Sequence, residues 1–226
     1  MTRHIACGLG CAWLATLVVG QTALAVTENF DEGNAANWTE VQGDWAAADG
    51  EYKQAEIAWT TTSTLETYHR SFFGDIGWTD YMFEATVRID EGGPVAPILG
   101  IFFRVSEKSD AGGYYLFRLD ERAAEGPGLI KAPNETIQIN GGKPAEIGRD
   151  YVLMVEVQGS DIRCYVDGVL EIEVTDDSFP AGAVGLGSFD AAASFDNVNV
   201  NGDGIPTAVE SRGKLPAVWA RLRSEH

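Results

Sequence analysis

The chain contains few cysteines, and their positions exclude a disulfide framework. Cys7 and Cys11 lie in an apolar run near the N-terminus, and Cys164 is the third and last cysteine of the 226 residues. A domain formed by the rest of the chain must therefore be stabilised by its hydrophobic core, for which about 200 residues are sufficient. Because Cys164 alternates with Ile162 and Val166, we expect a buried thiol that packs as a small apolar side chain.

Histidine is equally scarce, and paired catalytic glutamates are missing. His4 and His226 lie near the two ends of the chain, so His69 has no second histidine for a zinc site or a triad. No E-x-D-x-x-E run places two carboxylates on one strand face, the arrangement that retaining glycoside hydrolysis requires. Glu171 and Glu173 are explained as solvated charges beside a hairpin. The sequence therefore favours binding over catalysis.

Positive charge is also in short supply. Sixteen Lys and Arg residues face 34 Asp and Glu residues, for a formal net charge of −18. This balance argues against nucleic acid or an anionic membrane surface as a partner, and it suits neutral ligands or cations. Since 45% of the residues are hydrophobic, the chain is expected to fold rather than remain disordered.

The longest apolar run is too short and too close to the N-terminus for a membrane-spanning helix. Arg3 precedes the run from Ile5 to Val19, and the sequence Ala23-Leu24-Ala25 offers an A-x-A cleavage site. We expect a signal peptide over residues 1–25, so that the protein is secreted, either extracellular or periplasmic. The remaining chain divides into a domain over residues 26–200 and a tail over residues 201–226.

Alternating apolar and polar residues predict an all-β domain without a long helix. From Tyr81 to Ile89 every second residue is apolar, and the pattern returns in the strands ending at Val105 and Asp120. Asp49-Gly50 and Asp167-Gly168 are hairpin turn signals, whereas residues 57–80 look looser and place His69 in a loop. Short strands at regular spacing are typical of a two-sheet antiparallel β-sandwich of the jelly-roll type.

Several motifs carry a resemblance to a known superfamily. These are YMFEATVRI, GIFFR, GYYLFRLDE, a VDG hairpin and the SFDNVNV ending. Over residues 28–200 the chain resembles the concanavalin A-like lectin/glucanase superfamily, which includes laminin G-like modules, and GIFFR also resembles the 3-keto-disaccharide hydrolase family. The resemblance implies the jelly-roll fold. It leaves function open, because the superfamily holds lectins, carbohydrate-binding modules, glycoside hydrolases and adhesion modules.

Polar side chains on the outward side of the central strands form the candidate ligand site. If these strands pair in order, one concave face presents Glu84, Arg88, Arg104, Tyr114, Arg118 and Asp120, with Trp78 or Trp59 as a stacking platform. Arginine suits bidentate contact with vicinal hydroxyls or a carboxylate. We therefore predict a secreted carbohydrate-binding module for an oligo- or polysaccharide. The alternatives are a glycoside hydrolase or lyase, a structural or adhesion module, and plain cross-strand ion pairing.

Two groups of oxygen-bearing side chains are candidates for calcium. Asn201, Asp203 and Glu210 follow part of a calcium-loop spacing, although Thr207 and Glu210 also fit a capping box at a helix start. Asp31 and Asp196 form the second group, which the pairing of first and last strands would bring together. Turn and strand-end hydrogen bonds are the alternative explanation for both aspartates.

The C-terminal tail differs in character from the acidic body. Basic residues are frequent in it, and apolar residues recur at helical spacing, namely Leu215, Val218, Trp219 and Leu222. We expect a short C-terminal helix. It either docks on the acidic body or engages a protein partner through residues 207–226.

Overall fold

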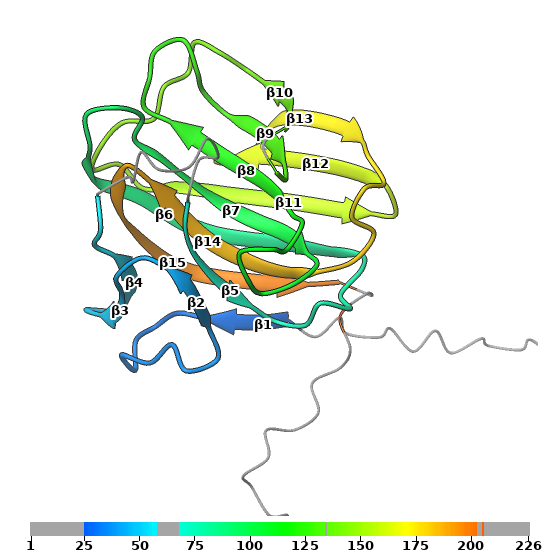
Figure 1. The fold of residues 1–226 in the computed structure, drawn as a ribbon, viewed down its shortest axis with the longest axis horizontal. Helices are drawn as coiled ribbons and strands as arrows, with labels where there is room; N and C mark the ends of the chain where they lie inside the picture. The colour runs from blue at the N-terminus through cyan, green and yellow to red at the C-terminus, as the bar shows by residue number, and fades with distance from the viewer. Residues whose placement is uncertain (1–24, 58–67, 134, 203–204, 206–226) are drawn as a thin grey trace, which may run out of the picture.

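The protein folds into two stacked antiparallel sheets (Figure 1). The computed structural model describes residues 25–57, 68–133, 135–202 and 205, which contain fifteen strands. The expected signal peptide and C-terminal helix fall outside the described residues. Within those residues, no helix has the length and apolarity needed to cross a membrane. The all-β sandwich expected from the alternation is confirmed.

The first sheet, which we call sheet A, contains the long strands β6 and β15 at its centre. Its order is β13 (Val169–Thr175), β12 (Asp161–Val166), β11 (Tyr151–Gln158), β6 (Tyr81–Gly92), β15 (Ala191–Asn201), β4 (Glu51–Gln54) and β3 (Trp45–Ala48). β1 (Ala25–Glu28) also pairs with β15, and Ala25 lies opposite Asn201. The two ends of the folded body therefore lie side by side.

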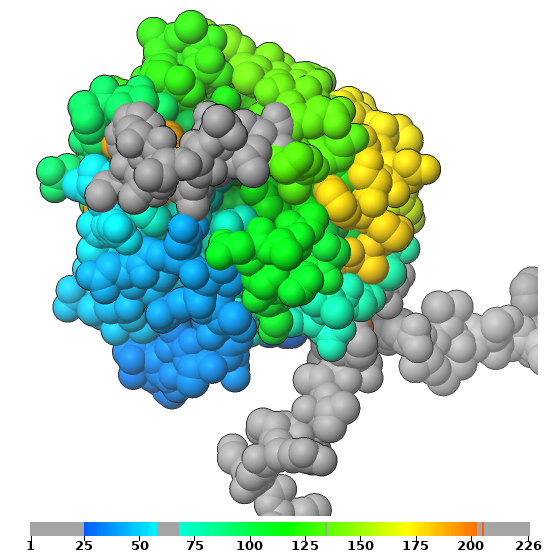
Figure 2. Space-filling model, viewed as in Figure 1, coloured from blue at the N-terminus to red at the C-terminus, as the bar shows by residue number. Residues whose placement is uncertain are grey.

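The second sheet, sheet B, has seven strands. Its order is β10 (Glu135–Ile139), β9 (Gly128–Lys131), β8 (Tyr115–Asp120), β7 (Ile98–Val105), β14 (Ala183–Phe189), β5 (His69–Phe73) and β2 (Thr39–Gln42). In the space-filling view the blue N-terminal segments abut the green central segments, so that parts distant in sequence form one surface (Figure 2).

The main hydrophobic core lies between the sheets and follows the predicted alternation. On β6 the five residues Tyr81, Phe83, Ala85, Val87 and Ile89 are buried, and they meet the inward side chains of sheet B. Cys164 is fully buried in this core, as expected, and burial raises the pKa of its thiol. The two predicted hairpins are also confirmed, since their turn residues Asp49 and Asp167 have positive φ and each precedes a glycine.

A second apolar cluster covers the outer face of sheet B, the face turned away from sheet A. It includes Tyr68, Phe72, Phe102, Leu116 and Phe189, all at most 6% exposed. Strands buried on both faces show continuous apolar runs instead of alternation. The expectation that His69 lies in a loop was therefore wrong: His-Arg-Ser-Phe-Phe forms β5, and all five residues are buried.

Candidate functional site

The polar residues that the sequence proposed as one ligand face lie in separate places. Glu84 and Arg88 belong to β6 in sheet A, whereas Arg118 and Asp120 belong to β8 in sheet B. The strands do not pair in the order assumed: β6 pairs with β11 and β15, and the next strand, β7, pairs with β8 and β14. The chain changes sheet between β6 and β7, so the expected single face is not formed.

Sheet B carries a cross-strand row of two arginines and three glycines on its outer face. Successive pairing partners place Arg70, Gly187, Gly100, Arg118 and Gly128 on one line across β5, β14, β7, β8 and β9. Neighbouring strands are about 4.8 Å apart, so the two arginine backbones are roughly 14 Å apart. We call this set the arginine–glycine row.

Asp120 is the centre of a charged cluster around Arg118 of the row. It is fully buried, and Arg118 donates to its Oδ2 from Nη1 at 2.5 Å. Arg122 donates to Oδ1 from Nε at 2.9 Å and from its backbone nitrogen at 3.0 Å, while Arg118 also reaches Glu125 at 3.2 Å. Burial alone would raise the pKa of Asp120, but the hydrogen bonds from Arg122 and the charges of both arginines hold it below its usual value. Asp120 therefore remains an ionised hydrogen-bond acceptor.

Arg70 occupies one end of the row, on β5. Its Nη2 donates to Asp110 at 2.6 Å, and its guanidinium lies 5.7 Å from the centre of the Tyr114 ring. Arg70 and Arg118 are each 6% exposed, and among the described residues the Nε of each is buried without a hydrogen-bond partner. Unpaired buried donors are unfavourable by about 1–3 kcal/mol each, so each arginine carries one donor that the described residues leave unsatisfied.

Aromatic rings line the same face beside the row. Phe102 contacts Tyr68, Phe72 and Tyr114 edge-on, with ring centres 5.9, 5.8 and 5.0 Å apart. A Cβ at Gly187 would lie 2.7 Å from the Phe102 ring and 2.3 Å from a backbone oxygen, so only glycine fits there. The face thus combines charged donors and acceptors with buried rings that pack against one another.

Four residues of this face were missed by the sequence reasoning: Arg70, Phe102, Arg122 and Glu125. Arg70 lies in the segment expected to be loose, because β5 lacks alternation, and Phe102 was not singled out as a site residue. The sequence spacing Asp-x-Arg at positions 120 and 122 was the available signal for Arg122, whose backbone and side chain both bind Asp120.

Arg104 does not lie on the outer face of sheet B, and its side chain holds other parts of the chain together. It has a φ of 52°, and the pairing of β7 with β14 shifts register beside it, which marks a β-bulge. Its guanidinium donates to the carbonyl oxygens of Phe179, Pro180 and Gly159. The bulge turns the side chain toward the end of the sandwich, where it connects segments of both sheets.

Trp78 does not form a stacking platform in the described structure. It is 6% exposed and packs in the main core, with its ring 6.0 Å from that of Phe73 and 6.4 Å from that of Tyr81. The alternative platform, Trp59, falls outside the described residues.

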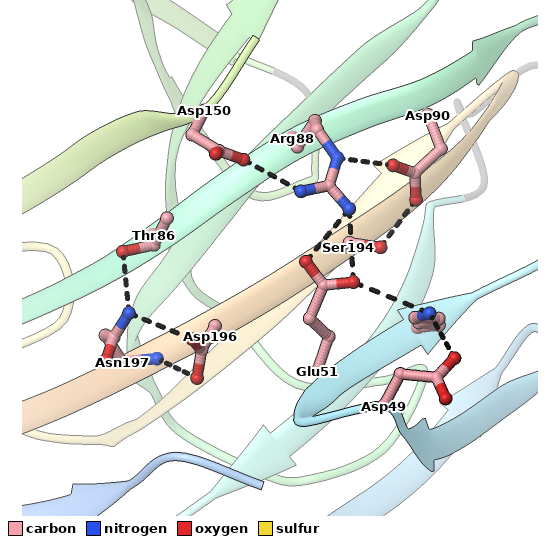
Figure 3. Close-up of polar contacts among 10 residues, drawn as sticks. Asp49, Glu51, Thr86, Arg88, Asp90, Asp150, Ser194, Asp196 and Asn197 are labelled. Atoms are coloured by element: carbon pink, nitrogen blue, oxygen red, sulfur yellow. Dashed lines mark hydrogen bonds and ion pairs between the residues drawn. The ribbon is translucent and has the colours of Figure 1, made fainter. Parts of the chain in front are cut away.

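Arg88 lies on the outer face of sheet A within an ion-pair network (Figure 3). It donates to Asp90 at 2.6 Å, to Asp150 at 2.9 Å and to Glu51 at 2.9 Å. Glu84 lies on the same strand, with Asn199 and Met154 as its cross-strand partners. All three nitrogens of Arg88 are engaged, so the network is better explained as cross-strand pairing than as a ligand site.

Asp31 and Asp196 come close enough to interact. Burial raises the pKa of Asp196, hydrogen bonding from Asn197 opposes this, and the charges of Asp31, Glu51 and Asp150 raise it further. Asn201 ends β15 opposite Ala25, and Asp203 and Glu210 fall outside the described residues. In the part of the chain that the structure describes, no group of three or more acidic, histidine or cysteine residues is arranged to hold a metal ion.

Comparisons with known proteins agree with the fold. A carbohydrate-binding module, CBM66, from Bacillus subtilis superposes with a TM-score of 0.62 at 24% identity, covering 75% of this chain and 98% of that one. A β-glucanase from Bacillus licheniformis gives a TM-score of 0.56 at 13% identity over 80% of this chain and 99% of its own. A protein with a galectin-like fold from Bacillus subtilis gives 0.57 at 11% identity, over 80% and 96% of the two chains.

A search among curated proteins found no match. The family model described as the 3-keto-alpha-glucoside-1,2-lyase-like domain matches residues 25–201, which are also the limits of the strands from β1 to β15. This chain therefore belongs to the family of 3-keto-alpha-glucoside-1,2-lyase-like domains.

Proposed function

We propose that this protein is a secreted carbohydrate-binding module that holds a saccharide against the outer face of sheet B. The observation that carries the proposal is the arginine–glycine row. Among the described residues, its two arginines are buried, each has an Nε without a hydrogen-bond partner, and each has a carboxylate within hydrogen-bond distance. A sugar hydroxyl both donates and accepts, so it can join a guanidinium to a carboxylate.

The charges of this face favour a neutral sugar. Among the described residues, the arginines Arg70, Arg118 and Arg122 are balanced by Asp110, Asp120 and Glu125. A uronate would meet arginines whose terminal nitrogens already bind carboxylates, within a protein of net charge −18. CBM66 and the β-glucanase, both named for carbohydrates, support this ligand class by analogy of fold.

The family description favours a lyase as the second candidate. Elimination across C1 and C2 of a 3-keto-glucoside requires a base that removes the C2 proton, which the neighbouring ketone acidifies. Asp120 is the most buried carboxylate of the face, but two arginines bind it and lower its pKa, so it is a weak base. Binding is therefore the better supported function.

Substitution of the row arginines tests the proposal. We expect Arg70→Ala and Arg118→Lys each to weaken binding of neutral glycans on a glycan array about 10–100-fold, since a hydrogen bond to a charged group contributes about 1.5–3 kcal/mol. Arg163→Ala is the matched control, because Arg163 is partly exposed and pairs with Glu173 in sheet A. Circular dichroism melts establish that each variant is folded.

Three outcomes would contradict this assignment. Binding that both substitutions leave unchanged would remove the row from the site. Absence of binding to every glycan would favour a structural or adhesion module. Release of product from 3-keto-glucosides, lost in Asp120→Asn, would make the protein a lyase.

We also propose one calcium ion at Asp31 and Asp196. Calcium requires six to eight oxygen ligands, so backbone carbonyls and water would complete the set. The mutual repulsion of these carboxylates, which raises the pKa of Asp196, would be relieved by a cation. The second group, Asn201, Asp203 and Glu210, remains the alternative position.

Thermal melts in chelator and in millimolar calcium test the metal. Calcium at a hundred times its dissociation constant adds about 2.7 kcal/mol, which corresponds to a rise in Tm of roughly 5–10 °C for a chain of this length. Asp196→Asn should abolish the rise, while Asp203→Ala should leave it. The opposite result would place the ion in the tail loop, and an unchanged Tm in the wild type would exclude calcium. Magnesium serves as the control cation.

A further inference from the structure

A separate cavity of about 370 Å³ lies between the two sheets, where β8, β11, β12 and β13 meet the segment from Lys143 to Arg149. Leu119 lines it, and Leu119 lies between Arg118 and Asp120 on β8 but points inward. The cavity therefore opens on the opposite side of β8 from the proposed saccharide face. Its volume is in the lower range of small-molecule pockets.

The inner wall of this cavity is apolar. Leu119, Ala145 and Tyr151 are between 2% and 6% exposed, and Val166 and Val169 complete the wall. The hydroxyl of Tyr151 accepts a hydrogen bond from the backbone nitrogen of Glu146 at 2.8 Å. An apolar group entering here would remove its own surface from water.

A buried carboxylate faces this apolar wall. The side chain of Glu171 lines the cavity and is only 7% exposed, while Lys143, which contacts both of its oxygens at 2.7 and 2.8 Å, is 60% exposed. The backbone oxygen of Glu171 accepts a hydrogen bond from Asn140, which fixes β13 at this point. The expectation that Glu171 is a solvated charge was therefore wrong. Glutamate side chains are seldom so buried, and among the described residues the cation that binds Glu171, Lys143, extends from solvent.

The charges around the cavity disfavour an anion. Lys143 and Arg149 are cationic, and Glu146, Asp167 and Glu171 are anionic, so the lining carries one net negative charge. The guanidinium of Arg149 is occupied by Asp167 at 2.9 Å, and it stacks 4.3 Å from the centre of the Tyr151 ring. Among the described lining residues, Glu171 can therefore accept a hydrogen bond from a ligand. A ligand anion could pair with Lys143 only after Lys143 leaves Glu171.

We propose that this cavity binds a small amphipathic molecule whose hydrogen-bond donor, a hydroxyl or an ammonium group, takes the place of Lys143 on Glu171. The apolar body of the ligand packs against Leu119, Ala145 and Val166. Lys143 moves outward into solvent, where its side chain already lies for the most part.

Three probes that share an eight-carbon alkyl chain and differ in their head group test this inference. Octan-1-ol, below its solubility limit, and octylammonium, below its micelle concentration, should bind the full-length protein in calorimetric titrations, and octanoate should bind at least tenfold more weakly. Glu171→Gln should reduce octylammonium binding about 10–100-fold and octan-1-ol binding less, because the charge is lost but one acceptor remains. Glu173→Gln is the control, since Glu173 is on the same strand and exposed.

Val169→Trp gives a second test that does not touch the buried carboxylate. Val169 lines the cavity and is 58% exposed, so a larger side chain there should block entry of all three probes while the fold is retained. The proposal is overturned if octanoate binds as tightly as octylammonium, or if Glu171→Gln leaves octylammonium binding unchanged. It is also overturned if neither octan-1-ol nor octylammonium binds.

Discussion

Replacing Asp120 with alanine should lower the free energy of unfolding by about 3–5 kcal/mol, because it removes the counter-ion of a buried arginine. The side chain of Arg118 is 7% exposed, and its Nη1 donates to Asp120 at 2.5 Å. Without Asp120, the one carboxylate that Arg118 still pairs with among the described residues is Glu125, which is 3.2 Å away and partly exposed. Chemical denaturation at neutral pH, followed by circular dichroism, measures the change.

The pH dependence of stability distinguishes the charge of Asp120 from its shape. Since its folded pKa lies below the ordinary value near 4, Asp120 contributes stability above that pH, and the contribution is lost as the pH falls through the folded pKa. Asp120→Asn should therefore be much less stable than the wild type at pH 6–7. The difference should shrink as the pH is lowered below about 4.

Asp90→Ala provides the matched control on the other sheet. Asp90 also pairs with an arginine at 2.6 Å, but its side chain is 35% exposed and Arg88 keeps two further carboxylates. Exposed pairs contribute about 0–1 kcal/mol, so the loss there should be small. This account is contradicted if Asp90→Ala and Asp120→Ala lower the free energy of unfolding equally. It is also contradicted if the difference in stability between wild type and Asp120→Asn does not change with pH.

The direction of side chains within a strand could be predicted from the sequence, whereas strand pairing could not. All five residues assigned to the inward side of β6 are buried in the main core. Alternation is a property of one strand and carries no information about the neighbouring strand. The pattern therefore could not show that β6 and β7, consecutive in the chain, lie in different sheets, and the proposed ligand face combined residues from both.

Residues of the arginine–glycine row were only partly predictable for a related reason. Arg118 stands in a recognisable strand, and its position on the outer face was correctly predicted. Arg70 lies in β5, where Phe72 faces outward and Phe73 faces the main core, so both faces are apolar and the period of two disappears. A strand that is apolar on both faces lacks the period of two, so its own sequence seldom identifies it as a strand.

Arg104 shows how a single bulge reverses a prediction. Regular alternation places its side chain on the same face as Gly100 and Phe102, which point outward. The positive φ at Arg104 inserts an extra residue opposite β14, so that Val105 joins the outer cluster and Arg104 turns to the end of the sandwich. No local motif marks this bulge, because the residue that adopts positive φ is an arginine and not a glycine.

Arg104→Ala should therefore destabilise the fold by about 3–4 kcal/mol without changing saccharide affinity. The side chain is 3% exposed, and its loss leaves the carbonyl oxygens of Phe179, Pro180 and Gly159 without their charged donor. Arg104→Lys should recover less than half of the loss, since one ammonium group cannot reach three separated carbonyls as a planar guanidinium does. Thermal and denaturant unfolding measure both variants.

Arg104→Gly separates the side-chain contacts from the backbone strain at this position. Glycine adopts the φ of 52° without the penalty of a Cβ, so this variant should be about 1 kcal/mol more stable than Arg104→Ala. Glycan binding at 10 °C, where all three variants are folded, should stay within twofold of the wild type, whereas Arg118→Lys should lose at least tenfold. A tenfold loss of glycan binding in folded Arg104→Ala would return Arg104 to the ligand site, and the structural role assigned to its bulge would then be incomplete.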